Sequence, residues 1–253
     1  MGIIKIFNIR KNKHNSLMFH YAHFICDCVF PEFYMGIHNQ CKTIVRLSNI
    51  RQTIGNFANF YQKIFNIKNM ELPPIKYSNL KVVKKICIKK EKIPKEGYIR
   101  FRNFIWRKFN TINIPNFPRI LLIKRGVSHK LINNPNIPEA LKQNGSNRRE
   151  IKDINKLFTM LKTRFTSNFK MVTLEKLTFQ EQVSHFYNAD IIIAAHGAGL
   201  SNMFFCRPKT KVIEVFCNKK WYFFPIISAM LDLEHSICEN KINKIYEQVI
   251  KLS

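Results

Sequence analysis

The residues with the clearest chemical potential form a glycine-containing turn that follows the apolar run at residues 191–195. Glycine lets backbone N–H groups approach a ligand closely. The first turn of a helix presents unpaired N–H donors and a partial positive charge. The turn therefore predicts a site for an anion such as a phosphate or diphosphate. The residues expected to face that anion are His196, Gly197, Ala198, Gly199, Leu200 and Asn202.

This turn matches neither of two common phosphate-binding motifs. A dinucleotide-binding fingerprint would place its third glycine where Asn202 stands, and a P-loop would end in Gly-Lys-Ser/Thr. The alternative interpretation is a tight turn whose histidine makes an ordinary hydrogen bond within the protein. The two interpretations differ in whether the backbone donors are left for a ligand.

The segments around the turn predict an α/β fold. Strand-like apolar segments alternate with helical ones, a pattern typical of a parallel sheet with crossover helices. Ligands bind at the carboxyl ends of strands in such sheets, and the turn falls at one of those ends. Thr178 and Glu181 have the spacing of a helix-capping box. We expect strands at 119–124, 170–174, 189–194 and 211–216, and helices at 148–164, 178–186 and 200–205.

The N-terminal half predicts a smaller α/β domain, in which short apolar runs alternate with basic stretches. Two prolines and two asparagines within residues 113–118 indicate a linker. We therefore expect an acceptor-side domain at 1–113 and a ligand-binding domain at 114–253. In the first domain, strands are expected at 42–47 and 79–88, and helices within 17–34, 55–67 and 98–109.

Charge is the unusual feature of the composition. The chain has 42 Lys and Arg against 16 Asp and Glu, a net charge of +26. Such a field attracts polyanions, and a nucleic-acid-binding protein is one alternative. The charge is spread along the chain, in a sequence rich in Lys, Asn, Ile and Phe, and no RNP, zinc-finger or helix-turn-helix pattern accompanies it. These features disfavour nucleic acid as the partner.

Cysteine usage and hydropathy set the expected location. Seven cysteines without a paired C-x-x-C motif indicate neither a disulfide framework nor a structural zinc site. A reducing compartment, the cytoplasm, is therefore expected, with peripheral attachment to an anionic membrane as an option that the basic surface allows. Apolar runs are shorter than the roughly 20 residues that cross a bilayer.

The block from His196 to Val215 resembles the signature of glycosyltransferase family 61. It has His-Gly-Ala-Gly-Leu, a small residue and Asn, followed by Phe204-Phe205, Pro208 and the strand Val212-Ile213-Glu214-Val215. Residues 174–183 are similar to the family's preceding helix, and His23-Phe24 with Asp27 resemble its N-terminal segment more weakly.

This resemblance implies a GT-B architecture, with two Rossmann-like domains of which the N-terminal one is small or trimmed. It implies transfer of a sugar, with inversion, from a nucleotide-sugar donor such as a UDP-sugar to a hydroxyl of a glycan or protein acceptor. No cofactor or metal ion is expected. A family member that binds the sugar nucleotide without turnover is an alternative.

The family pattern also implies basic residues that bind the diphosphate. Arg125 and Arg149 are the candidates here, although a long segment separates Arg125 from Arg148, and Asp153 replaces the Asn of the pattern. Solvated surface charge is the alternative for either arginine. Glu214 lies within an apolar strand and is expected to accept from ribose hydroxyls, or else to face solvent at a sheet edge. We expect His196→Ala to abolish transfer and to leave the fold intact.

Inversion requires one general base within hydrogen-bond reach of the attacking hydroxyl. Asp27 and His23 are the candidates, because a spacing of four residues places them on one face of a helix. His20 and Glu32 are further options. The alternatives are a core helix with a hydrogen-bonded histidine, or a metal site that adds Cys26 and Cys28.

Overall fold

The computed structural model describes ten stretches of the 253-residue chain, and two compact units divide it at residue 97. Each unit is described by itself. The strand expected at 79–88 lies outside the described residues. The described stretches are 5–7, 24–30, 33–34, 44–46, 58–65, 93–111, 114, 116–126, 149–216 and 223–253.

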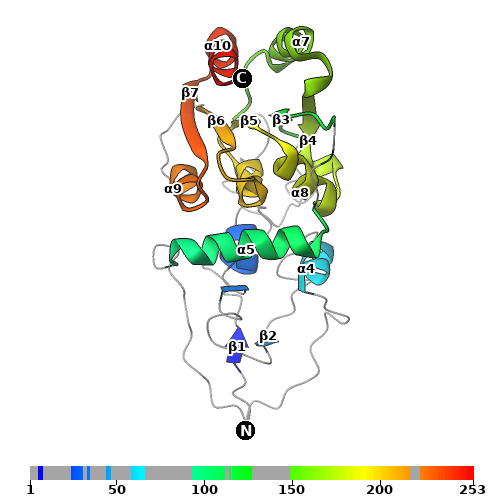
Figure 1. The fold of residues 1–253 in the computed structure, drawn as a ribbon, viewed down its shortest axis with the longest axis vertical. Coiled ribbons are helices and arrows are strands. Elements are labelled where there is room, and N and C mark those ends of the chain that lie inside the picture. Colours follow the sequence, from blue (N-terminus) through cyan, green and yellow to red (C-terminus); the bar gives the residue numbers. More distant parts are fainter. Residues whose placement is uncertain are drawn as a thin grey trace, which may run out of the picture. The chain divides into compact units, whose positions relative to one another are not determined.

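The second unit is built on a five-stranded parallel sheet with the order β4-β3-β5-β6-β7 (Figure 1). In chain order within this unit the arrangement is 2-1-3-4-5, one of the common doubly wound orders. The mixed α/β fold with a parallel sheet is thereby confirmed. The strands are β3 (Ile120–Lys124), β4 (Phe169–Thr173), β5 (Ile191–Ala195), β6 (Lys211–Phe216) and β7 (Glu234–Glu239).

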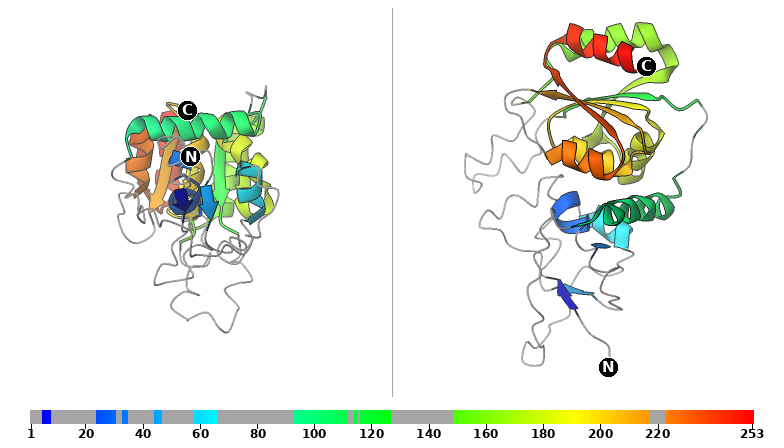
Figure 2. Two further views of the ribbon diagram at one scale, coloured as in Figure 1. Left: turned by 90° about the horizontal axis from the view of Figure 1, so that it is seen from below. Right: turned by 60° about the vertical axis from the view of Figure 1, so that its left-hand side comes forward.

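Helices cover both faces of this sheet (Figure 2). The chain runs outward from β3 to β4 and then back across β3 to β5. Because each crossover is right-handed, this reversal places the crossover helices that follow β4 on the face opposite α7. On one face lie α7 (Ile154–Phe165) and α10 (Ile242–Leu252), and on the other lie α8 (Phe179–Asn188), the 3-10 helix η10 (Ala198–Phe205) and α9 (Phe223–Met230).

Strand β5 shows why the sheet is so apolar. Every residue of Ile191–Ala195 is buried, from 0 to 6% exposed. Alternate side chains point to opposite faces, and Ile191, Ile193 and Ala195 belong to the core formed with α7 and α10. A strand covered on both faces has no polar side, so its sequence reads as a continuous apolar run.

Helix α8 begins at the predicted capping box, and both of its hydrogen bonds form. The hydroxyl of Thr178 accepts from the N–H of Glu181 at 3.2 Å, and the N–H of Thr178 donates to Oε2 of Glu181 at 2.7 Å. The bond from the Thr178 N–H, and then a bond from the Thr178 hydroxyl to the same Oε2 at 2.8 Å, lower the pKa of Glu181. Such a cap contributes about 1 kcal/mol to helix stability.

Helix α5 (Lys95–Lys108) explains where the second unit begins. Tyr98 stacks on Phe204 with ring centroids 5.7 Å apart, and Phe101 meets the same ring edge-on at 5.3 Å. Arg102 is 4% exposed and donates through Nη1 to the carbonyl of Leu231 at 2.7 Å. The contact boundary therefore precedes the 113/114 boundary expected from the sequence.

Two helical segments differ from the expectation. The helix expected from residue 148 begins only at Ile154, because Asp153 has a left-handed backbone (φ 52°) that a helix does not continue through. The helix expected from residue 200 is the 3-10 helix η10, which starts at Ala198. Among the described residues, none of the helices combines the length and hydrophobicity needed to cross a bilayer.

The first unit contains a two-stranded parallel sheet, in which β1 (Lys5–Phe7) pairs with β2 (Ile44–Arg46). It also contains the π-helix η2 (Phe24–Val29) and α4 (Ala58–Phe65). Tyr61 and Ile64 of α4 are buried. The strand expected at 42–47 and the helix expected within 55–67 are confirmed.

The histidine of α8 predicts a pH-dependent contribution to stability. His185 is 5% exposed and its ring lies 4.9 Å from that of Phe117. Burial, and then the charge of Lys170, lower the pKa of His185 from 6.5 to about 4. The unfolded chain therefore binds this proton first, and the free energy of unfolding should fall as the pH drops from 6.5 toward 4.

We expect His185→Phe to remove this dependence, which amounts to about 3 kcal/mol at most for such a difference in pKa. Urea unfolding at pH 7.5 and pH 5 would measure it in the parent and the variant. A constant packing difference cancels in this comparison, because it affects both pH values equally. An equal loss of stability in both proteins at pH 5 would contradict the prediction.

Candidate functional site

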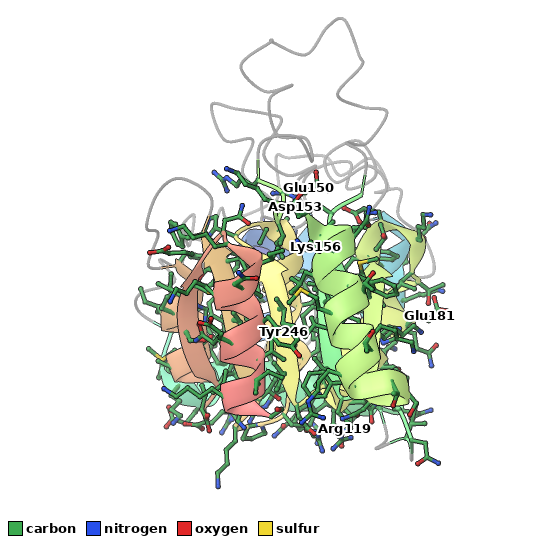
Figure 3. The ribbon with its side chains drawn as sticks, turned by 90° about the horizontal axis from the view of Figure 1, so that it is seen from above. Arg119, Glu150, Asp153, Lys156, Glu181 and Tyr246 are labelled. Carbon is green, nitrogen blue, oxygen red and sulfur yellow. The ribbon has the colours of Figure 1, made fainter. Side chains whose placement is uncertain are left out.

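The glycine turn lies at the carboxyl edge of the sheet, as predicted, directly after β5. Its neighbour β3 is where the strand order reverses, since β4 and β5 leave it on opposite sides. Crevices at this reversal are the usual ligand sites of open α/β sheets. Figure 3 shows the two ends of this unit, with Glu150 and Asp153 at the start of α7 and Arg119 at the opposite end.

Arg125 follows β3 and lies against the glycine turn. A Cβ atom on Gly197 would stand 3.0 Å from Nη1 of Arg125 and 3.3 Å from its Cζ. The backbone of Gly197 (φ 164°) is extended and open to any residue, so the glycine is needed for the space and not for its conformation. Nη1 of Arg125 also donates to the carbonyl of Arg149 at 3.4 Å. Three predicted site residues from separate segments therefore meet here.

The backbone amides of the turn are donors at the start of η10. The amide of Leu200 donates to the carbonyl of Gly197 at 3.0 Å. Within the described part of the chain, the amides of Gly197, Ala198 and Gly199 have no hydrogen-bond acceptor. With the arginine beside them, these donors make a local environment suited to an anion.

His196, the first residue of the turn, is largely buried, with 8% of its surface exposed. Its Nδ1 hydrogen-bonds Oε1 of Glu214. Its ring lies 5.3 Å from that of Phe224 and 5.8 Å from that of Phe216. The turn thus contains a histidine with an internal partner, as the alternative interpretation held, together with the amide donors that the ligand interpretation needs.

Glu214 is fully buried in β6, between β5 and β7. The alternative of a solvent-facing edge residue is therefore wrong. Its Oε2 lies 2.9 Å from Nε2 of His235. Burial raises the pKa of Glu214, but the hydrogen bonds from His196 and His235 outweigh burial and leave that pKa below its ordinary value. Glu214 is an anion held by two imidazoles, and its expected bond to a ribose stays a prediction.

Two further predicted residues are buried beneath the turn. Leu200 is 1% exposed, and Asn202 has no exposed surface. Nδ2 of Asn202 donates to Oε1 of Gln182 at 2.9 Å, and Nε2 of Gln182 donates to the carbonyl of Leu174 at 3.0 Å. These bonds connect η10 to α8 and hold η10 in place behind the turn. Contact of Leu200 or Asn202 with a nucleotide stays a prediction.

The acceptor-side candidates lie outside this description. His23 lies outside the described residues, and of Asp27 only the backbone is described, in η2. Cys26 beside it is buried. Among the described residues, there is no group of three or more His, Cys, Asp or Glu that could hold a metal ion. The two predicted bases therefore stay predictions.

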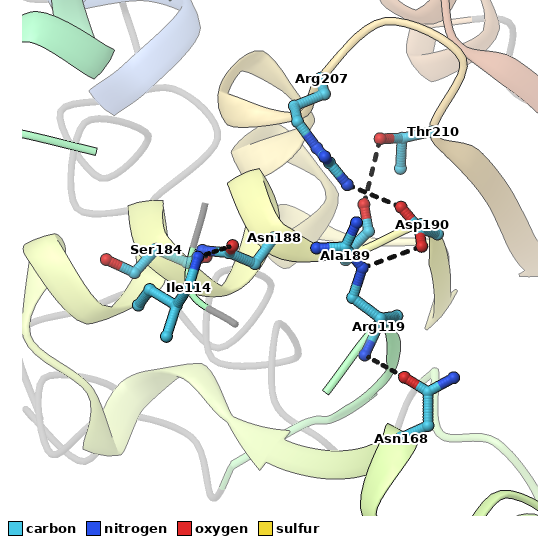
Figure 4. Close-up of polar contacts among 9 residues, drawn as sticks. All are labelled: Ile114, Arg119, Asn168, Ser184, Asn188, Ala189, Asp190, Arg207 and Thr210. Carbon is cyan, nitrogen blue, oxygen red and sulfur yellow. Dashed lines mark hydrogen bonds and ion pairs between the residues drawn. The ribbon is translucent and has the colours of Figure 1, made fainter. Parts of the chain in front are cut away.

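A cavity of about 720 Å³ lies at the amino edge of the sheet, away from the glycine turn. Asp190 at its wall accepts from Nε of Arg119 at 3.0 Å and from Nη2 of Arg207 at 2.6 Å (Figure 4). Lys211 donates to the carbonyl of Leu252 at the end of α10. Because helices end here with their carbonyl groups, these cations offset a negative edge. The cluster has a structural explanation and is separate from the candidate site.

A known protein family and a known protein are similar in sequence to this chain. The sequence model of the family described as Glycosyltransferase 61 matches residues 21–213, and the chain belongs to this family. An EGF domain-specific O-linked N-acetylglucosamine transferase from Gallus gallus is 34% identical over 103 residues, which is 40% of this chain and 19% of that protein. The chain thus matches about a fifth of the length of that relative.

The burial of Glu214 changes what is expected of His196→Ala. Alanine would remove one partner of a carboxylate that water does not reach, so we expect it to lower the free energy of unfolding by about 2–3 kcal/mol. His196→Asn retains an amide near the position of Nδ1 and should stay close to the parent. Urea unfolding of the three proteins at pH 7.5 measures this. Equal destabilisation by Ala and Asn would show that the bond to Glu214 contributes little.

Proposed function

We propose that this chain is an inverting glycosyltransferase that takes its sugar from a nucleoside-diphosphate sugar. A UDP-sugar is the first candidate for this donor. The observation that carries the proposal is the close approach of Arg125 to Gly197 beside the amides of the turn. In this proposal the diphosphate binds there. Membership of the family supports sugar transfer as the chemistry.

The proposed chemistry follows from the charge that develops in the reaction. As the glycosidic bond of the donor breaks, negative charge accumulates on the leaving diphosphate, and donors already in place stabilise that charge. The Arg125 guanidinium and the amides of Ala198 and Gly199 supply such donors. His196 supplies a further donor through Nε2 when both of its ring nitrogens carry a proton, since Glu214 accepts from its Nδ1. The carbonyl of Arg149 accepts from Arg125, and the Arg149 side chain is the second candidate cation for the diphosphate.

The acceptor side of the proposal rests on the N-terminal residues. A GT-B arrangement would bring a second domain to the sugar, and Asp27 or His23 would remove the proton from the attacking hydroxyl. The name of the Gallus gallus relative makes UDP-N-acetylglucosamine the first donor to test and a protein hydroxyl the first acceptor class. The cytoplasmic location and the peripheral membrane contact expected from the sequence stay predictions.

Two arginines at opposite ends of β3 offer a matched test. Arg125 follows the strand at the candidate site, and Arg119 precedes it at the other edge. We expect a UDP-sugar to raise the melting temperature of the parent and of Arg119→Gln. Arg125→Gln should lose this effect, because a charge-assisted bond to the diphosphate is worth about 1.5–3 kcal/mol. A thermal-shift titration at fixed salt measures the difference.

Turnover is tested separately, by release of free UDP in the presence of candidate acceptors. We expect Arg125→Gln to slow transfer by about 100–1,000-fold. Donor binding without UDP release would identify the chain as a sugar-nucleotide-binding family member without activity. Binding of DNA that exceeds binding of every sugar nucleotide at matched salt would favour the nucleic-acid alternative and contradict the proposal.

A further inference from the structure

Behind His196, hydrogen bonds continue from strand to strand across β6 and β7 to helix α9. Glu214 meets His196 through Oε1 and His235 through Oε2, the latter at 2.9 Å. Nδ1 of His235 in turn lies 2.8 Å from Oγ of Ser228. These four side chains come from the turn after β5, from β6, from β7 and from α9. We refer to Ser228, His235, Glu214 and His196 as the relay.

The side chains of the relay are almost completely shielded from solvent. Glu214 and Ser228 have no exposed surface, and the side chains of His235 and His196 are 7% and 11% exposed. Water therefore does not compete for the carboxylate oxygens. The orientation of Glu214, and through it that of His196, is set by the partners within the protein.

The positions of the protons in the relay follow from which side-chain atoms can donate and which can only accept. An ionised carboxylate only accepts, so His196 must present Nδ1–H and His235 must present Nε2–H. A neutral His235 with its proton on Nε2 has a lone pair on Nδ1, which the hydroxyl of Ser228 satisfies by donating. The carboxylate of Glu214 fixes this tautomer of His235, and the hydroxyl of Ser228 is compatible with it. The relay has one consistent arrangement of protons when both histidines are neutral.

We propose that His235 and Ser228 are positioning residues that hold the Glu214 carboxylate, and through it the ring of His196, in one orientation. Nε2 of His196 is then the nitrogen that meets the diphosphate. The inference rests on the proposed function, which places the diphosphate on that side. Buried carboxylates orient a histidine in the same manner in hydrolase triads and at metal sites. Here a second histidine holds the carboxylate.

Substitution of His235 by Gln or by Asn tests its two hydrogen bonds one at a time. His235→Gln places its amide near Nε2 and can still donate to Glu214. His235→Asn places its amide near Nδ1, where it reaches Ser228 but not Glu214. Ser228→Ala breaks the far end of the relay and leaves both histidines in place, which provides a test if His235→Asn does not fold. None of these variants alters a residue that contacts the diphosphate in the proposal.

Two measurements test the relay. Proton–nitrogen correlation spectra of the imidazole rings, in which His196→Asn identifies the signals of His196, report its bond to Glu214 without any donor. We expect the Nδ1–H signal of His196 to keep its position in His235→Gln and to move in His235→Asn and in Ser228→Ala, because its position follows the geometry of that bond. In transfer assays, His235→Asn should lower kcat by about 10–100-fold at an almost unchanged KM, as loss of a supporting residue does, and His235→Gln should restore most of it.

The outcomes distinguish the relay from the proposed function. An Nδ1–H signal of His196 that is the same in all four proteins, or moved equally by His235→Asn and His235→Gln, overturns the relay. A parent whose melting temperature responds to no sugar nucleotide overturns the function, whatever the spectra show. Agreement of the displaced Nδ1–H signal with the loss of kcat in the folded His235→Asn and Ser228→Ala variants supports the inference.

Discussion

A carboxylate without exposed surface lies in the middle of an apolar parallel sheet, and two histidines hold it there. An ionised group in such a place is costly unless its oxygens are satisfied, and Glu214 meets this condition through His196 and His235. The constraint acts in both directions. The carboxylate needs the imidazoles for stability, and His196 receives a fixed orientation at the very residue where β5 turns into η10. Fold stability and site geometry therefore depend on the same hydrogen bonds.

The strand order explains why the site forms at this turn. Because β4 and β5 leave β3 on opposite sides, the segments that follow β3 and β5 are brought together at one edge. Arg125 and Gly197, far apart in sequence, come into contact there. Gly197 provides the space for the guanidinium, and the bonds of Asn202 and Gln182 hold η10 against α8 so that the amides remain in place. Buried residues behind the turn thus determine the position of those that we propose to contact the ligand.

Much of this arrangement could be predicted from the sequence, and the reasons for success and failure are physical. The buried strand β5 and the capping box of α8 are local patterns, so they were found within one or two residues. The close approach of Arg125 to Gly197 depends on crossover handedness, and only its general location at the carboxyl edge followed from the sequence. Helix α9, strand β7 and helix α10 were not expected. Strand β7 has an exposed or half-buried surface at the sheet edge, and His235 and Ser228 carry no motif of their own.

The two ends of β3 show why net charge alone says little about function in this chain. Arg119 and Arg125 flank the same strand, and both belong to the large excess of basic residues. At the amino edge, where helices end in carbonyl groups, Asp190 binds Arg119 and Arg207, and the cations stabilise the fold. At the carboxyl edge, where η10 begins with its amides, the same residue type lies against a glycine and adds to a positive environment. The polarity of the sheet and its helices, more than the number of cations, decides which arginine is suited to an anionic ligand.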